Sequence, residues 1–167
     1  LHLSDRRQRQ MCIRDRCDLP SNVSIATLTG RYYAMDRDTR WDRTRKAYDA
    51  IANGVGKIYR DPSKAIQDSH NKGLTDEFIE PVILSEYKGI KGKNDGLIFC
   101  NFRADRARQI LNALTNQNFE GFTRPNEKIF TKVVGMIEYD SDFKKKFNVL
   151  FDREQIKNGL GEWISLN

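Results

Sequence analysis

The sequence predicts an α/β layered domain in which helices flank a mostly parallel sheet. Two observations carry this prediction: short apolar, β-branched runs alternate with amphipathic helical segments, and one of these runs leads directly into a helix. The 167 residues are 38% hydrophobic and include nine Phe and six Tyr, which suffices for one domain with a sizeable core. No run approaches the roughly 20 apolar residues of a membrane-spanning helix. We therefore expect a soluble globular domain.

The first half of the chain should contain one strand and two helices. The run VSIATLT, residues 23–29, is β-branched and ends at a glycine, as a buried strand that enters a tight turn does. From Trp41 onward apolar residues recur at helical spacing, and Gly54 is placed to cap the end of that helix. Asp61–Pro62 offers an N-cap followed by proline at the first helical position, which predicts a second, short helix.

The second half should contain the main strand-to-helix unit. Residues 75–84 look strand-like toward their end, where Pro81 favours an edge position or a bulge. The run GLIFCNF, residues 96–102, is typical of a strand covered on both faces, and the amphipathic helix RADRARQILNALT follows it. Two further strands are expected over Lys128–Tyr139 and Asn148–Phe151.

Both ends of the chain look unlike the interior. Residues 1–18 have neither the apolar core of a secretory signal nor any helical or strand periodicity, and MCIRDR resembles translated sequencing-adaptor sequence. We expect this leader to be artefactual or disordered, with a genuine basic tail as the alternative. The final IKNGLGEWISLN carries a Trp and an amphipathic pattern with nothing after it, so we expect a domain truncated at both ends.

The positive charge is unevenly distributed. The chain has a formal charge of +6 and a pI of 9.3, but five arginines and two aspartates in residues 1–17 account for half of that charge. The remaining surplus favours a local site for small anions over an extended nucleic-acid surface. A basic nucleic-acid-binding module remains the alternative, because aromatic residues are interleaved with arginines in RYYAMDRDTRWDR.

Cysteine and histidine usage argues against a disulfide framework and a metal centre. The three cysteines, Cys12, Cys17 and Cys100, match no common zinc spacing, and Cys100 lies in an apolar run where we expect it to be buried. This usage indicates a reducing, cytoplasmic compartment. The histidines are His2 and His70, and we expect His70 at the surface. Because nucleophile-elbow, Walker and dinucleotide motifs are absent, we assign no catalytic residue and no metal ligand to these residues.

Two arginine clusters each follow a predicted strand. They contain Arg31, Arg37, Arg40 and Arg43 in the first cluster and Arg103, Arg106 and Arg108 in the second. In α/β sheets ligands bind beyond the carboxyl ends of strands, where helix N-termini also attract anions. The guanidinium fork donates two parallel hydrogen bonds to a carboxylate or phosphate. Arg31 and Arg103 stand at such an edge, which predicts a binding site for an acidic, phosphorylated ligand.

A structural interpretation competes at each of these positions. Surface arginines commonly form weak ion pairs, and the available partners are Asp36, Asp38, Asp42 and Asp105. Arg40, Arg43 and Arg108 fit that interpretation best. Asp36 and Asp105 each lie between two arginines, where they would either orient the guanidinium groups or neutralise a basic loop. Tyr32 and Tyr33 are expected to pack rather than to flank a ligand.

Three segments extend these motifs into a family resemblance. IATLTGRYYAMDRDTRWDRTRKAYDAI, KGLTDEFIEPV and DGLIFCNFRADRARQI, in this order, resemble the cofactor-independent (2,3-bisphosphoglycerate-independent) phosphoglycerate mutases of the alkaline phosphatase superfamily. The resemblance, which covers about residues 21–165, implies that residues 19–167 are part of the phosphoglycerate-binding (transferase) domain of a glycolytic isomerase. It also implies that Arg31, Arg37, Arg103 and Arg106 bind substrate.

The resemblance further implies machinery that this chain lacks. In the family, a serine on a second domain with two manganese ions (Mn2+) takes the phosphoryl group from 3-phosphoglycerate and returns it to give 2-phosphoglycerate. That serine, the metal ligands and further substrate-binding His, Arg and Asp residues would lie before Val23 or after Asn167, and a catalytic lysine would lie shortly after Asn167. The chain alone is therefore predicted to contact substrate without turnover. No 2,3-bisphosphoglycerate, nucleic-acid partner or membrane is implied, and we expect the intact enzyme to be a monomer.

Overall fold

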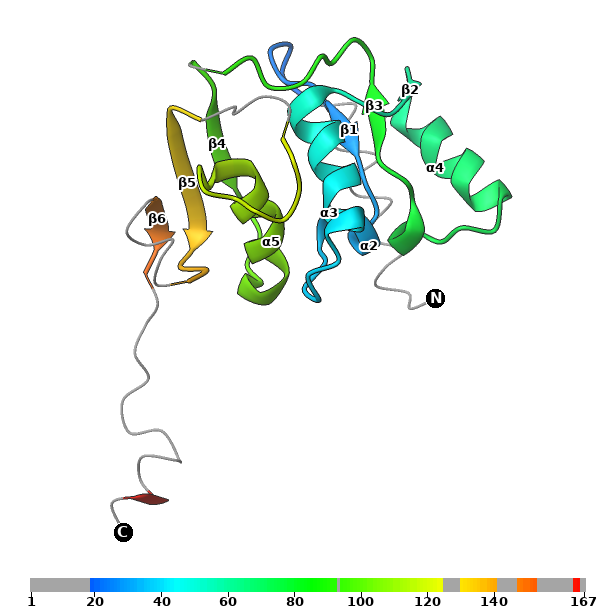
Figure 1. Ribbon diagram of the computed structural model, residues 1–167. Helices are drawn as coiled ribbons and strands as arrows, with labels where there is room; N and C mark the ends of the chain where they lie inside the picture. Colours follow the sequence, from blue (N-terminus) through cyan, green and yellow to red (C-terminus); the bar gives the residue numbers. More distant parts are fainter. Residues whose placement is uncertain (1–18, 93, 125–129, 141–146, 153–163, 166–167) are drawn as a thin grey trace.

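The computed structural model (Figure 1) describes residues 19–92, 94–124, 130–140, 147–152 and 164–165. The expectations for residues 1–18, and for most of the C-terminal IKNGLGEWISLN, lie outside these ranges. Within them the α/β class is confirmed, and three of the four strand pairings are parallel. The strands form two three-stranded sheets rather than one.

The first sheet has the order β1-β3-β2 and is built from very short strands. They are β1 (Thr27–Leu28), β2 (Lys57–Tyr59) and β3 (Val82–Leu84). β3 is parallel to β2 and antiparallel to β1. The prediction of an edge position for the strand after Pro81 is therefore wrong, since β3 is central. Proline is tolerated there because it precedes the strand, where its missing N–H removes no ladder hydrogen bond.

The strand expected over residues 23–29 is shorter than predicted. Only Thr27 and Leu28 are in β1, and Val23 is 48% exposed. The reason lies in the partner strand: β3 begins after Pro81 and ends before Ser85, whose positive φ of 56° turns the chain away. A three-residue partner offers no ladder for a seven-residue strand, so the β-branched residues before Thr27 remain unpaired in the sheet.

The second sheet is entirely parallel, in the order β4-β5-β6. It contains β4 (Gly96–Phe99), β5 (Lys132–Ile137) and β6 (Asn148–Phe151). β4 is not covered on both faces as predicted: Leu97 and Phe99 face the core, whereas Ile98 is 67% exposed. Because side chains alternate between faces, Cys100 falls on the exposed side, and its predicted burial is wrong.

Three helices begin and end close to where the sequence predicts: α3 (Trp41–Tyr48), α4 (Pro62–Asn71) and α5 (Ala104–Thr115). The short helix α2 (Arg31–Ala34) stands where the sequence predicted only a tight turn. α3 continues as a π-helical turn to Gly54, whose φ of 63° supplies the expected left-handed cap. The Asp61 carboxylate caps α4 by accepting a hydrogen bond from the Ser63 amide at 3.0 Å. Within the described ranges no helix combines the length and apolarity needed to cross a bilayer.

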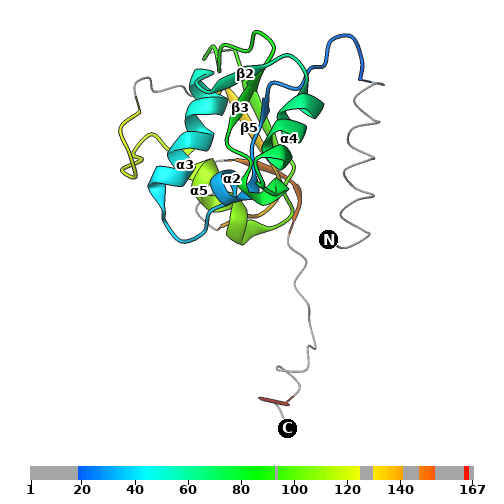
Figure 2. The same cartoon turned by 90° about the vertical axis from the view of Figure 1, so that its right-hand side faces the viewer.

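The main hydrophobic core lies between α3 and α5. Figure 2 shows α3 and α4 on opposite sides of the first sheet. Ala47 and Tyr48 of α3 pack with Ile110 and Leu114 of α5, and Leu97 of β4 packs against them. Between the two helices, the buried hydroxyl of Thr44 lies 3.4 Å from the side-chain oxygen of Gln109. This packing brings the segments that follow β1 and β4 to the same end of the molecule.

Candidate functional site

The first arginine motif begins where β1 runs into α2. The Gly30 amide donates to the carbonyl of Ile79 at 2.8 Å, and a β-carbon at Gly30 would collide with the backbone of Glu77. Only glycine allows this close approach. The approach places Arg31 beside the short 3-10 turn Asp76–Phe78, and Arg31 Nε lies 3.5 Å from Glu77 Oε1, with both side chains about half exposed.

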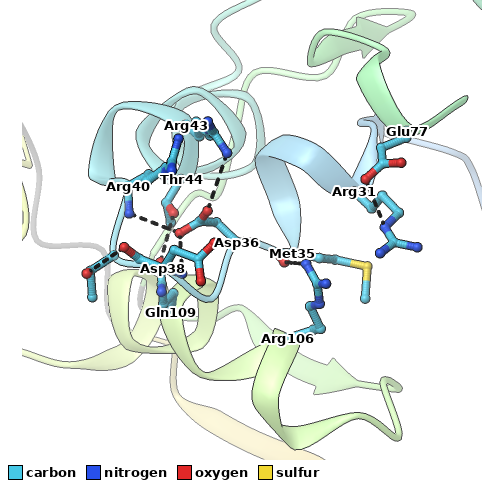
Figure 3. Close-up of polar contacts among 11 residues, drawn as sticks. Arg31, Met35, Asp36, Asp38, Arg40, Arg43, Thr44, Glu77, Arg106 and Gln109 are labelled. Atoms are coloured by element: carbon cyan, nitrogen blue, oxygen red, sulfur yellow. Dashed lines mark hydrogen bonds and ion pairs between the residues drawn. The ribbon is translucent and has the colours of Figure 1, made fainter. Parts of the chain in front are cut away.

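After α2 the chain turns around the carboxylate of Asp36, which is only 5% exposed. Asp36 Oδ2 accepts hydrogen bonds from the backbone amides of Asp38 and Arg40, each at 3.0 Å. Asp36 Oδ1 lies 3.8 Å from Arg43 Nη1. These contacts are drawn in Figure 3. The predicted ion pairing of Arg43 is confirmed, and the turn is held from inside by a single carboxylate.

Arg43 also contacts the aromatic residues of the motif. Its guanidinium carbon lies 3.8 Å above the ring centroid of Tyr32, and that ring packs 5.1 Å from Tyr33 and 5.1 Å from Phe78. The expectation that the two tyrosines pack is confirmed. Since Tyr32 is engaged by Arg43, and Trp41 packs 5.2 Å from Phe119, the interleaved aromatics do not form a free stacking platform for nucleic-acid bases.

The second arginine motif opens α5 and interlocks with the first. Arg106 Nη1 donates to the carbonyl oxygen of Met35 at 3.2 Å, and Arg37 Nη1 lies 3.4 Å from Asp105 Oδ2. Each motif thus supplies the group that orients an arginine of the other. The exposed Arg103 forms the N-cap position of α5, with its amide bonded to Asn101 Oδ1 at 3.0 Å.

The structure therefore brings three of the four predicted binding arginines close together. Arg37 and Arg106 are linked through neighbouring residues, and Figure 3 shows Arg31 and Arg106 on either side of Met35. Arg103 lies one turn before Arg106, at the start of the same helix. We call these four residues the arginine edge. Two of its ion pairs are about half exposed, so an incoming anion can displace Glu77 or Asp105 at low cost.

Arg108, expected to be structural, lies apart from this edge. Its Nε donates to the Tyr139 carbonyl at 2.9 Å and lies 3.7 Å from Asp140 Oδ2. The structural expectation is confirmed, although the ion-pair partner is a residue that sequence reasoning did not nominate. Sequence reasoning also did not nominate Glu77 as the partner of Arg31, or the Met35 carbonyl as the partner of Arg106. Nothing in the sequence spacing links either partner to its arginine.

The described residues do not fit a metal centre. Among them no group of three or more His, Cys, Asp or Glu side chains is arranged to hold a metal ion. His70 is not simply at the surface as predicted: its side chain is 33% exposed, and Nε2 lies 2.7 Å from Asp76 Oδ1. No step of a reaction through manganese can be derived from these residues.

An α/β domain with an arginine-lined edge is the class of protein that the fold and the site define. Over residues 8–141 the chain matches the family model described as BPG-independent PGAM N-terminus, where PGAM is phosphoglycerate mutase. The chain belongs to this family, the 2,3-bisphosphoglycerate-independent phosphoglycerate mutases, as the resemblance in the sequence predicted.

Individual relatives agree with this family. The chain is 42% identical over 153 residues to the 2,3-bisphosphoglycerate-independent phosphoglycerate mutase of Rhodopseudomonas palustris, covering 92% of the chain and 30% of that relative. It is 49% identical over 146 residues to the enzyme of the same name from Ehrlichia ruminantium, covering 87% of the chain and 27% of that relative. The chain thus spans less than a third of the length of these relatives.

A solved structure supports the fold. The chain superposes on a Leishmania mexicana phosphoglycerate mutase, crystallised at low cobalt concentration, with a TM-score of 0.70 and 24% sequence identity. The superposition covers 85% of the chain and 27% of the Leishmania protein. At this identity the likeness concerns the arrangement of helices and strands.

Proposed function

We propose that this chain binds the phosphoglycerate substrate of a 2,3-bisphosphoglycerate-independent phosphoglycerate mutase, which interconverts 3-phosphoglycerate and 2-phosphoglycerate. The observation that carries the proposal is the interlock of the two arginine motifs, in which Arg37 pairs with Asp105 and Arg106 bonds to Met35. The packing of α3 on α5 brings the two motifs to one end of the molecule, although the paired residues lie 68 and 71 positions apart in the sequence. A single ligand bound at this edge can therefore contact arginines of both motifs.

The substrate class fits the chemistry of the arginine edge. A phosphoglycerate carries a phosphate and a carboxylate, and each accepts two parallel hydrogen bonds from a guanidinium group. We assign Arg31, Arg37, Arg103 and Arg106 to these contacts. Phosphoryl transfer depends on positioning and on charge neutralisation, so several arginines at one edge would both hold the substrate and offset its charge.

The remaining chemistry belongs to the rest of the enzyme. In this proposal residues 19–167 are part of the phosphoglycerate-binding domain, and the serine nucleophile and the two Mn2+ ions lie on a second domain. The family name supports independence from 2,3-bisphosphoglycerate. We place the intact enzyme in the cytoplasm as a monomer. The exposed free thiol of Cys100 suits a reducing compartment.

Calorimetric titration of the 167-residue chain with 3-phosphoglycerate tests the binding proposal. Arg31→Ala and Arg103→Ala should each weaken binding about 10- to 100-fold, as expected when a charge-assisted hydrogen bond is lost. Arg45→Ala is the matched control, because Arg45 is an exposed arginine whose ion pair with Asp49 lies within one helix. Equal affinity for inorganic sulfate, or an equal loss in Arg45→Ala, would refute a specific site.

A coupled assay tests the division of labour. The 167-residue chain should not interconvert the two phosphoglycerates, with or without added manganese. The intact enzyme is the positive control. Metal-dependent interconversion by this chain alone would show that the catalytic groups lie within these residues, contrary to the proposal.

A further inference from the structure

We propose that Asp36 is a positioning residue of the arginine edge, and this inference rests on the proposed function. Its buried carboxylate shapes the turn from Met35 to Arg40 and thereby sets where Arg37 and Arg106 present their guanidinium groups. Asp36 is only 5% exposed, so it acts through its neighbours and not by touching the ligand.

The turn needs such a carboxylate because its backbone is strained. Thr39 has a φ of 56°, a left-handed conformation that β-branched residues rarely adopt. Asp36 Oδ2 accepts the amides of Asp38 and Arg40, which lie on either side of Thr39. The Thr39 hydroxyl also donates to the carbonyl of Asp38 at 2.7 Å. The turn is thus closed around Asp36, and without the carboxylate both amides lose their acceptor.

The carboxylate is itself held in place by two helices. Arg43 of α3 approaches Asp36 Oδ1 at 3.8 Å and at the same time covers the ring of Tyr32 in α2. The side chains of Arg43 and Asp36 are only 18% and 3% exposed, so the ion pair is shielded from water. A buried charge with a fixed partner keeps one orientation, which is what a positioning residue requires.

Two of the four arginines of the edge, Arg37 and Arg106, depend on the residues that flank Asp36. The preceding residue, Met35, uses its carbonyl oxygen to accept the hydrogen bond from Arg106 at 3.2 Å. The following residue, Arg37, reaches Asp105 at 3.4 Å. A change in the backbone at Asp36 therefore moves the acceptor of one arginine and the origin of the other, so Asp36 couples the two motifs.

Arginine side-chain NMR on the 167-residue chain, with calorimetric titration of 3-phosphoglycerate, tests this role. Asp36→Ala removes all three contacts of the carboxylate, whereas Asp36→Asn keeps an acceptor for the two amides and loses the charge that faces Arg43. Asp38→Ala is the matched control, since it removes the same charge from an exposed neighbour in the same turn. The Nε–Hε signals of Arg37 and Arg106 report their orientation without any ligand.

We expect both arginine signals to shift in Asp36→Ala, to shift less in Asp36→Asn, and to stay unchanged in Asp38→Ala. Affinity for 3-phosphoglycerate should fall about tenfold in Asp36→Ala and less in Asp36→Asn, because preorganisation is lost. If Asp36→Ala does not fold, Asp36→Asn decides. Arginine signals in Asp36→Asn that match those of Asp38→Ala would overturn the positioning role.

The two proposals fail in distinguishable ways. If the unsubstituted chain does not bind 3-phosphoglycerate, the proposed function of this chain fails, while the ligand-free arginine signals still decide the role of Asp36. If the unsubstituted chain binds and the Asp36 variants bind equally well with native arginine signals, the proposed function stands and the positioning role is wrong.

Discussion

Arg43 and Arg37 belong to the same motif, yet replacing Arg43 should mainly lower stability, whereas replacing Arg37 should mainly lower ligand affinity. Arg43 is enclosed: its side chain is 18% exposed, pairs with Asp36 and covers Tyr32. Arg37 is open: its side chain and that of its partner Asp105 are 55% and 54% exposed. Replacing each by alanine separates an arginine that holds the fold from one that is available to a ligand.

The expected losses of stability follow from these environments. Arg43→Ala removes a cation–π contact, about 0.5–2 kcal/mol, and leaves a buried carboxylate without its cation, about 1–3 kcal/mol. Because Asp36 keeps its two amide donors, we expect a total of about 2–4 kcal/mol. Arg37→Ala removes an exposed ion pair, which contributes about 0–1 kcal/mol.

Urea and thermal unfolding of both variants, beside 3-phosphoglycerate titrations, provide the assay. Arg43→Ala should lower the melting temperature by roughly 5–10 °C. Arg37→Ala should lower it by at most about 4 °C and should weaken 3-phosphoglycerate binding about tenfold or more. An Arg43→Ala protein as stable as the unsubstituted chain, or an Arg37→Ala protein that loses more stability than Arg43→Ala, would refute this reading of the site.

Three further predictions concern the scaffold. Leu111→Ala should lower the free energy of unfolding in urea by about 2–5 kcal/mol, because Leu111 is 1% exposed and its removal leaves a cavity. A loss smaller than that of an exposed substitution such as Leu150→Ala would contradict the core assignment. Gly54→Ala should lower the free energy of unfolding by about 2 kcal/mol or more, since φ is 63° and the added β-carbon would lie 2.7 Å from the Gly89 amide nitrogen. Gly73→Ala is the control that isolates the contribution of the steric clash, because Gly73 has a similar φ of 76° but lies in open space. Burial raises the pKa of Tyr139 above its ordinary value of 10.0, so the folded state keeps a proton that the unfolded chain loses. This contribution to stability is complete below the unfolded pKa and is lost as pH rises through the raised pKa, so unfolding measured from pH 8 to 11 should show a decline that Tyr139→Phe makes shallower.

The helices could be predicted because their signals are local. Asp61–Pro62 caps α4 and Gly54 ends the helical segment after α3 without reference to any distant residue. The strands depend on partners that the sequence does not reveal. Residues 23–25 have strand propensity, but the short β3 ends before it could pair with them. The apolar run at β4 gives no sign of the alternation between faces that leaves Ile98 exposed. Strand propensity describes how well a side chain fits a pleated, half-buried sheet surface, and that surface forms only when distant segments of the chain pack together.

The residues of the candidate site could be proposed from the sequence, but the contacts among them could not be predicted. Arg31 and Arg103 could be nominated because they follow strands, and ligands of α/β sheets bind beyond the carboxyl ends of strands. The contact of Arg106 with the Met35 carbonyl, and that of Arg31 with Glu77, depend on how distant segments pack. The role of Asp36 was open between orienting and neutralising, and its burial and two amide bonds favour orientation.

Titration of the chain with 3-phosphoglycerate, followed through the arginine Nε–Hε signals, tests most directly whether the two motifs form one binding site. We predict that the signals of Arg31, Arg37, Arg103 and Arg106 shift together with one dissociation constant, and that sulfate produces saturating shifts only at much higher concentration. Shifts that differ in midpoint between the two motifs, or that appear equally at the control residue Arg45, would contradict a single arginine edge.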